Sequence, residues 1–184
     1  MGLDMYLHRV PKVTSIEELE EMNDRLDEAA ANNTLMTELT EIQKEKSYIY
    51  SIDFSLNQYV DIEKWKENKE EWGHIISLTM RVGYWRKFNA LHNWFVDNVQ
   101  DGVDECEQHI VTREHLVELQ KTVDRVLSNR SKAAELFPTG AGFFFGGTEY
   151  DEYYWEDMKQ LQHTVGYLLT AEFYDCTYVY CSSW

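Results

Sequence analysis

Positive charge and proline are both scarce in this 184-residue chain. Seventeen lysines and arginines stand against 33 aspartates and glutamates, which gives a formal net charge of -16, and there are only two prolines. A negative field of this size repels nucleic acid and anionic membrane surfaces and favours basic partners, and it also keeps a protein soluble. We therefore expect no direct binding of DNA or RNA and no binding to membranes.

Sites built on cysteine or histidine are not indicated. The three cysteines, Cys106, Cys176 and Cys181, are odd in number and contain no CxxC pair, which argues against a disulfide framework. The six histidines contain no HxxxH pair, so we predict neither a metal site nor a cofactor. Because no GxSxG or other local nucleophile motif is present, we assign no catalytic residues and favour a binding protein over an enzyme.

Targeting and membrane-spanning segments are not recognisable either. The first residues lack the basic region and the apolar stretch of a signal peptide, and the sequence contains no run of 18 apolar residues. These features predict a cytoplasmic protein, in the host cell if the chain is encoded by a phage.

The apolar and aromatic content is high enough for a folded core. Hydrophobic residues make up 43% of the chain and aromatic residues 14%, too much for a disordered chain despite the charge. The length predicts a single domain over residues 1–184. Nothing in the sequence indicates an oligomeric state.

Hydrophobic spacing predicts strands at both ends of the chain and helices between them. Alternation indicates a strand over 2–10, which ends at Pro11, and another over 47–54. We also expect a short apolar strand over 143–145 and a final strand over 173–184. Spacings of three and four indicate helices over 15–31, 34–46, 84–99, 113–128 and 154–168. We expect an α+β fold in which a small antiparallel sheet includes both terminal strands and is covered by four to five helices.

The first candidate site is an acidic face on the helix predicted over 15–31. Its carboxylates recur at helical spacing and could imitate a phosphate backbone in a basic channel. A solvated helix face is the more common explanation. Segment 14–46 nevertheless contains ten acidic and three basic residues, a net charge of -7, and segment 97–107 contains five acidic residues and no lysine or arginine. The predicted partner-binding residues are Glu17, Glu20, Glu21, Asp24, Asp27, Asp101, Asp104 and Glu105.

The second candidate is the basic and aromatic segment 81–93. Arginine offers planar donors to phosphate and an aromatic face offers a stacking surface to a base, so this segment could bind a nucleotide. The competing interpretation is core packing with ion pairs to carboxylates. The alternative ligand-binding residues are Arg81, Tyr84, Trp85, Arg86, Lys87, Asn89, His92, Tyr150 and Tyr153.

Four stretches together resemble a known family. They are MGLDMYL at 1–7, GYWRKFNALHNWFV at 83–96, GFFFGGTEYDEYY at 142–154 and SSW at 182–184. The combination resembles a family of small acidic proteins from phages and prophages, which are similar in kind to the type II anti-CRISPR proteins that inhibit Cas9. The resemblance implies a viral accessory protein and transfers no residue roles.

Three hypotheses for the function follow. The first is a non-catalytic inhibitor of a host defence nuclease, whose acidic surface competes for a nucleic-acid-binding channel on a basic partner such as a Cas9-type nuclease. The second is a nucleotide-binding protein that uses segment 81–93, either to sequester a signal or to act on a phosphorylated ligand. The third is a phage structural or assembly accessory protein whose acidity only confers solubility.

Overall fold

The computed structural model describes residues 2–46, 79–142, 145–170 and 176–184. The chain forms two compact units, one comprising Met1–Val10 with Met80–Trp184 and the other comprising Pro11–Thr79. The strand predicted over 47–54 and most of the strand predicted over 143–145 lie outside the described residues. The single domain predicted from length stays a prediction.

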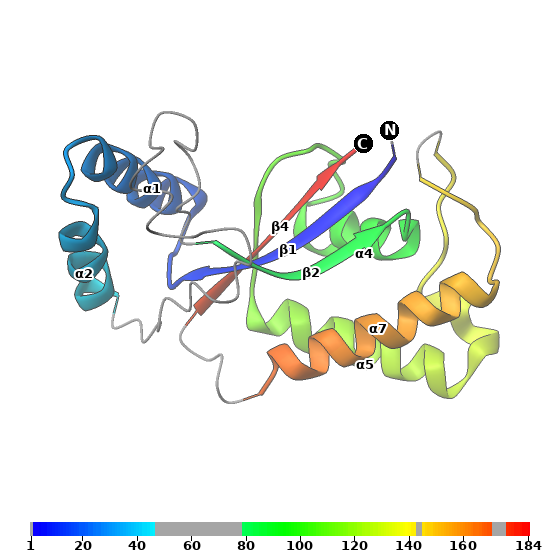
Figure 1. Cartoon of the computed structure of the whole chain (residues 1–184). Coiled ribbons are helices and arrows are strands. Elements are labelled where there is room, and N and C mark those ends of the chain that lie inside the picture. Colours follow the sequence, from blue (N-terminus) through cyan, green and yellow to red (C-terminus); the bar gives the residue numbers. More distant parts are fainter. Residues whose placement is uncertain (1, 47–78, 143–144, 171–175) are drawn as a thin grey trace. The chain divides into compact units, whose positions relative to one another are not determined.

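A four-stranded antiparallel sheet brings the two ends of the chain together in the first unit. Its order is β2 (Met80–Arg86), β1 (Asp4–Pro11), β4 (Cys176–Ser183) and β3 (His109–Val111), so the two terminal strands are neighbours at its centre (Figure 1). The α+β class and the inclusion of both terminal strands in the sheet are confirmed.

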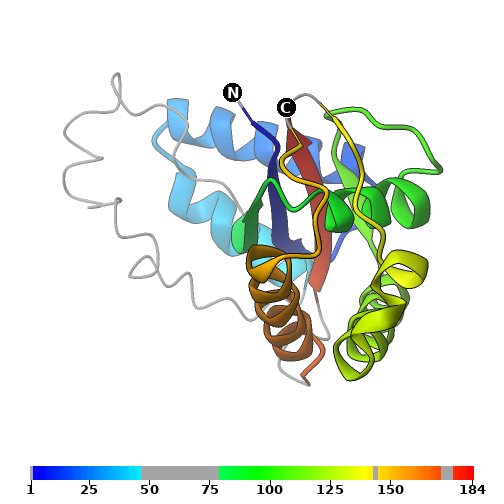
Figure 2. The same ribbon diagram turned by 90° about the vertical axis from the view of Figure 1, so that its right-hand side faces the viewer.

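The main core lies between this sheet and a layer of helices. Leu3, Met5 and Leu7 alternate along the first strand and are fully buried against α4 (Asn89–Val99), α5 (Arg113–Ser128) and α7 (Glu152–Leu168). Helices α5 and α7 lie side by side (Figure 2). A short 3₁₀ turn (Arg130–Lys132) and α6 (Ala133–Leu136) follow α5.

The helix predicted over 84–99 was wrong at its start, because the first residues of that range belong to a strand. Strand β2 continues to Arg86, where it pairs with Asp4, and α4 begins at Asn89. Aromatic residues suit a strand as well as a helix, and pairing with β1 decides between the two. The indole of Trp85 folds back over Gly83, where a Cβ atom would lie only 2.3 Å from the ring, so the strand depends on a glycine there. The three-residue strand β3 was not predicted because it is too short to show a period.

The second unit contributes α1 (Ile16–Ala31) and α2 (Leu35–Glu45). Both helices were predicted from their apolar spacing, and the helices over 113–128 and 154–168 are confirmed in the same way. The side chain of Ser15 caps α1 by accepting the backbone N–H of Glu18 at 3.2 Å.

Asn89 attaches the loop before α7 to the rest of the first unit. It is 2% exposed, its Nδ2 donates to the carbonyls of Phe145 at 2.9 Å and Gly147 at 2.8 Å, and its Oδ1 accepts the N–H of Gly140 at 3.0 Å. One buried amide thus fixes two separate parts of a loop that has no regular structure.

We predict that Asn89→Asp lowers the free energy of unfolding by about 2–4 kcal/mol and more than Asn89→Ala does, because a buried carboxylate would face two carbonyl oxygens. Urea denaturation measures this. The exposed Asn98 makes a single bond to the Trp94 carbonyl, so Asn98→Ala should stay within about 0.5 kcal/mol of the unaltered protein. Equal effects of the two Asn89 variants would contradict the proposed donor role.

Candidate functional site

One side of α1 is buried and the opposite side is acidic. Leu19, Met22, Leu26 and Ala29 form the buried side. At about 100° per residue, the acidic positions fall within an arc of about 120° on the other side. These exposed residues are Glu17, Glu20, Glu21, Asp24, Asp27 and Glu28, hereafter the acidic stripe.

Two cations in the described part of the second unit pair with carboxylates outside the acidic stripe. Arg25 donates to Glu38 at 2.7 Å and to both oxygens of Glu45 at 2.9 and 3.0 Å, and Lys46 pairs with Glu18. The hydrogen bond from Lys46, with that from the Thr14 backbone, lowers the pKa of Glu18 to about 2. Among the described residues, no member of the acidic stripe is in an ion pair.

The acidic stripe continues to the end of α1 where negative charge is unfavourable. The C-terminal end of a helix carries partial negative charge, which favours lysine or arginine there. The last turn of α1 contains no basic residue, and Asp27 and Glu28 lie beside it. The sequence therefore keeps two carboxylates in positions that oppose helix stability.

The second predicted acidic segment has a different structural role. Asp104 accepts a hydrogen bond from Nε2 of the fully buried His92 at 3.0 Å, and Nδ1 of the same ring contacts the hydroxyl of Tyr180 at 2.8 Å. A carboxylate only accepts, so Nε2 carries the proton in the neutral ring and Nδ1 accepts from the tyrosine. Asp104 thus fastens its loop to the core although it is exposed, as are Asp101 and Glu105.

Three of the predicted nucleotide-binding residues meet on β2. The guanidinium of Arg81 lies 5.5 Å from the centre of the Tyr84 ring, and Tyr84 donates to Asp4 at 2.6 Å, with Arg86 3.3 Å from the same carboxylate. The ring of Tyr6 lies 5.4 Å from that of Tyr84.

Two residues of β1 join this surface although the sequence did not single them out as ligand-binding. Tyr6 and His8 alternate with the buried leucine and methionine positions, and their rings stack with centroids 6.0 Å apart. Burial, and then the charge of Arg81, lowers the pKa of His8. The signal that could have found them is the strand alternation of residues 2–10.

The other predicted nucleotide-binding residues do not join this surface. Trp85, Asn89 and His92 are buried and serve the core and the loop contacts described above. Lys87 is exposed with a positive φ of 60°. Tyr153 is 77% exposed on α7, whereas Tyr150 lines a pocket.

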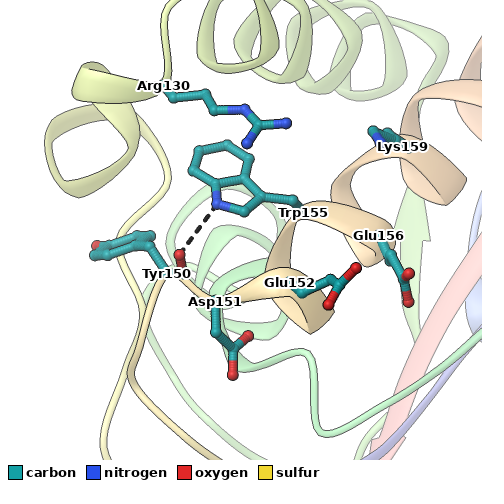
Figure 3. Close-up of a pocket in the computed structure, with 7 residues that line it drawn as sticks. All are labelled: Arg130, Tyr150, Asp151, Glu152, Trp155, Glu156 and Lys159. Atoms are coloured by element: carbon teal, nitrogen blue, oxygen red, sulfur yellow. Dashed lines mark hydrogen bonds between the residues drawn. The ribbon is translucent and has the colours of Figure 1, made fainter.

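That pocket, at the N-terminal end of α7, has a volume of about 380 Å³. Helix α7 contributes Glu152, Trp155, Glu156 and Lys159. Tyr150 and Asp151 from the preceding loop and Arg130 from the 3₁₀ turn complete the lining (Figure 3). The sequence named Tyr150 as an alternative ligand-binding residue but not Arg130, which is distant in sequence and is placed by tertiary packing.

The pocket is built around the indole of Trp155. Its Nε1 donates to the carbonyl of Tyr150 at 3.1 Å, and the guanidinium of Arg130 lies over the ring, 4.5 Å from its centre (Figure 3). Asp151 caps the helix by accepting the N–H of Tyr154 at 3.1 Å. The ring therefore has a fixed orientation and carries a cation on one face.

The neighbouring Asp157 is a partly buried carboxyl group on α7. Burial, and then the charges of Glu156 and Asp151, raise the pKa of Asp157 to about 6.

We predict that Asp157→Asn stabilises the protein at pH 7 by about 1 kcal/mol, a value reduced for solvent screening because the side chain is only half-buried. The folded state binds this proton more tightly than the unfolded chain between pH 3.8 and about 6, so ionisation destabilises the fold as pH rises through 6. Urea denaturation from pH 4 to 7 should show the advantage of the variant growing with pH. An advantage independent of pH would contradict the assignment.

Among the described residues, no cluster of histidine, cysteine, aspartate and glutamate is arranged to hold a metal ion. Within the same part of the chain, no helix has the length and apolar character needed to cross a membrane. Comparisons with protein-family models, with curated proteins and with solved structures found no match.

Proposed function

We propose that this protein is a non-catalytic inhibitor that binds a basic, nucleic-acid-binding channel of a partner through the acidic stripe of α1. The observation that supports the proposal most directly is that the six exposed carboxylates of the acidic stripe form no ion pair among the described residues. The nearby cations Arg25 and Lys46 are paired with other carboxylates. Such a face attracts a basic surface and speeds association with it.

The charge spacing of the acidic stripe is close to that of a nucleic-acid strand. From Glu17 to Glu28 the helix rises by about 16 Å at about 1.5 Å per residue. Six carboxylates over that length give roughly one charge every 3 Å, near the value of about 3.4 Å along one strand of DNA. A channel that normally neutralises phosphates would meet a similar charge density here.

The resemblance to small acidic phage proteins supports a host defence nuclease as the partner. A Cas9-type nuclease is one enzyme with such a positively charged channel. The acidic stripe would then exclude the nucleic acid by occupying its binding site, without any reactive group.

Charge reversal tests this proposal. We predict that Glu20→Lys combined with Asp24→Lys abolishes both pull-down of a guide-RNA-loaded Cas9-type nuclease and inhibition of its DNA cleavage. The matched control, Glu118→Lys with Glu135→Lys, changes the net charge equally on exposed positions of α5 and α6 and should leave binding within about twofold. Unchanged binding by the first variant would remove the mimicry mechanism.

A second pair of substitutions distinguishes a loss of binding from a loss of folding. Asp27→Lys with Glu28→Lys should weaken the same interaction while stabilising α1 by about 0.3–1 kcal/mol per residue, because both changes favour the helix dipole. A loss of binding that accompanies a gain of stability cannot come from misfolding.

Nucleotide binding is a second candidate function. It is favoured by the surface on β1 and β2 where Arg81, Tyr84 and Arg86 meet Tyr6 and His8.

We predict that Tyr84→Ala weakens the binding of a nucleotide by about tenfold or more, since stacking of one base on an aromatic ring contributes about 1–3 kcal/mol. Calorimetry with cyclic and linear nucleotides measures this, with the exposed Tyr167→Ala as the control. No heat with any nucleotide counts against this function.

A further inference from the structure

We propose that the pocket at the N-terminal end of α7 is a recognition site for an arginine side chain of a protein partner. The inference rests on the proposed function in one respect, that the partner presents a basic surface. It adds a second, separate site with a defined chemistry in the first unit of the chain.

The pocket already holds a guanidinium group. Arg130 lies over the indole of Trp155 at 4.5 Å from the ring centre, and no carboxylate of the described residues is within ion-pair distance of it. The contact with the ring is thus the interaction that places this exposed side chain. The intramolecular contact demonstrates that the ring accepts a planar cation.

The carboxylates beside the ring have unused acceptors. Glu152 and Glu156 are exposed and lie one turn apart on α7, and neither is in an ion pair among the described residues. A guanidinium entering the pocket would donate two parallel N–H groups to one of these carboxylates, a planar geometry that matches the two carboxylate oxygens. An ammonium group lacks that planar geometry, which is why we assign arginine rather than lysine.

Size and potential agree with this assignment. A volume of about 380 Å³ is near the lower end of the range for small-molecule pockets and suits one side chain better than a large cofactor. Three carboxylates line the pocket against two cations. The potential favours a cation over an anion.

The indole N–H of Trp155 supplies the readout, because its hydrogen bond to Tyr150 fixes it at the site. We would titrate the full chain with N-acetyl-arginine-amide in the millimolar range and follow this resonance by proton–nitrogen correlation NMR. Its absence from the spectrum of Trp155→Phe identifies it. We expect saturable movement with the arginine compound and none with N-acetyl-citrulline-amide, which has the same shape without the charge.

Two exposed charges give matched variants with opposite expected effects. Glu156→Gln removes an attractive charge and should weaken binding by about twofold to fivefold, whereas Lys159→Gln removes a repulsive charge and should strengthen it by a similar factor. A purely structural role of this helix would not produce opposite signs, and neither substitution disturbs a buried group.

Several outcomes would overturn the inference. They are a resonance that does not move, equal movement with the citrulline compound, changes of the same sign in both variants, or movement with inorganic phosphate in place of arginine. Glu20→Lys with Asp24→Lys should leave the arginine titration unaltered. If arginine does not move the indole resonance but Glu20→Lys with Asp24→Lys still abolishes binding of the nuclease, the proposed function stands without this pocket. If arginine moves the resonance but that variant still binds the nuclease, the pocket stands and the mimicry mechanism is removed.

Discussion

The surface of this protein depends on which of its many carboxylates are paired with its few cations. Arg25 and Lys46 bind carboxylates within the helical pair α1 and α2, and Arg86 shares Asp4 with a tyrosine hydroxyl. Arg130 contacts an aromatic ring instead. Since ion pairs at exposed positions contribute only about 0–1 kcal/mol each, their main consequence is to decide which carboxylates remain uncompensated.

Carboxylates that are equivalent in the sequence therefore have different physical roles. Those of the acidic stripe face solvent along one helix, and within the described part of the chain none of them is in an ion pair. Asp104 is instead part of a hydrogen-bonded chain that reaches Tyr180 through a buried histidine. Asp151 serves as a helix cap, and Glu152 and Glu156 line a pocket with an aromatic centre. Net charge alone cannot distinguish these environments.

Features that repeat along the chain could be predicted, and features that depend on distant contacts could not. Apolar spacing identified α1, α2, α5 and α7, and strand alternation identified both terminal strands, because each period reflects one buried face. Residues 84–86 were assigned to a helix because aromatic side chains fit both periods there, and pairing with β1 decides the outcome. The acidic stripe is a property of one helix and could be located from spacing. The pocket could not, because Arg130 reaches Trp155 only through the packing of α5 against α7.

The two proposed sites would contribute differently to recognition of a basic partner. A stripe of solvated carboxylates acts at long range, so it accelerates encounter and weakens as salt increases, but it discriminates poorly between one basic surface and another. A pocket with an oriented indole and adjacent carboxylates acts at contact distance and selects the shape of a guanidinium. Either site alone offers the modest energy typical of exposed charges. A partner that engaged both would gain affinity, because binding at the first site would make binding at the second intramolecular. Under the proposed function, the acidic surface would obtain speed from the first site and selectivity from the second.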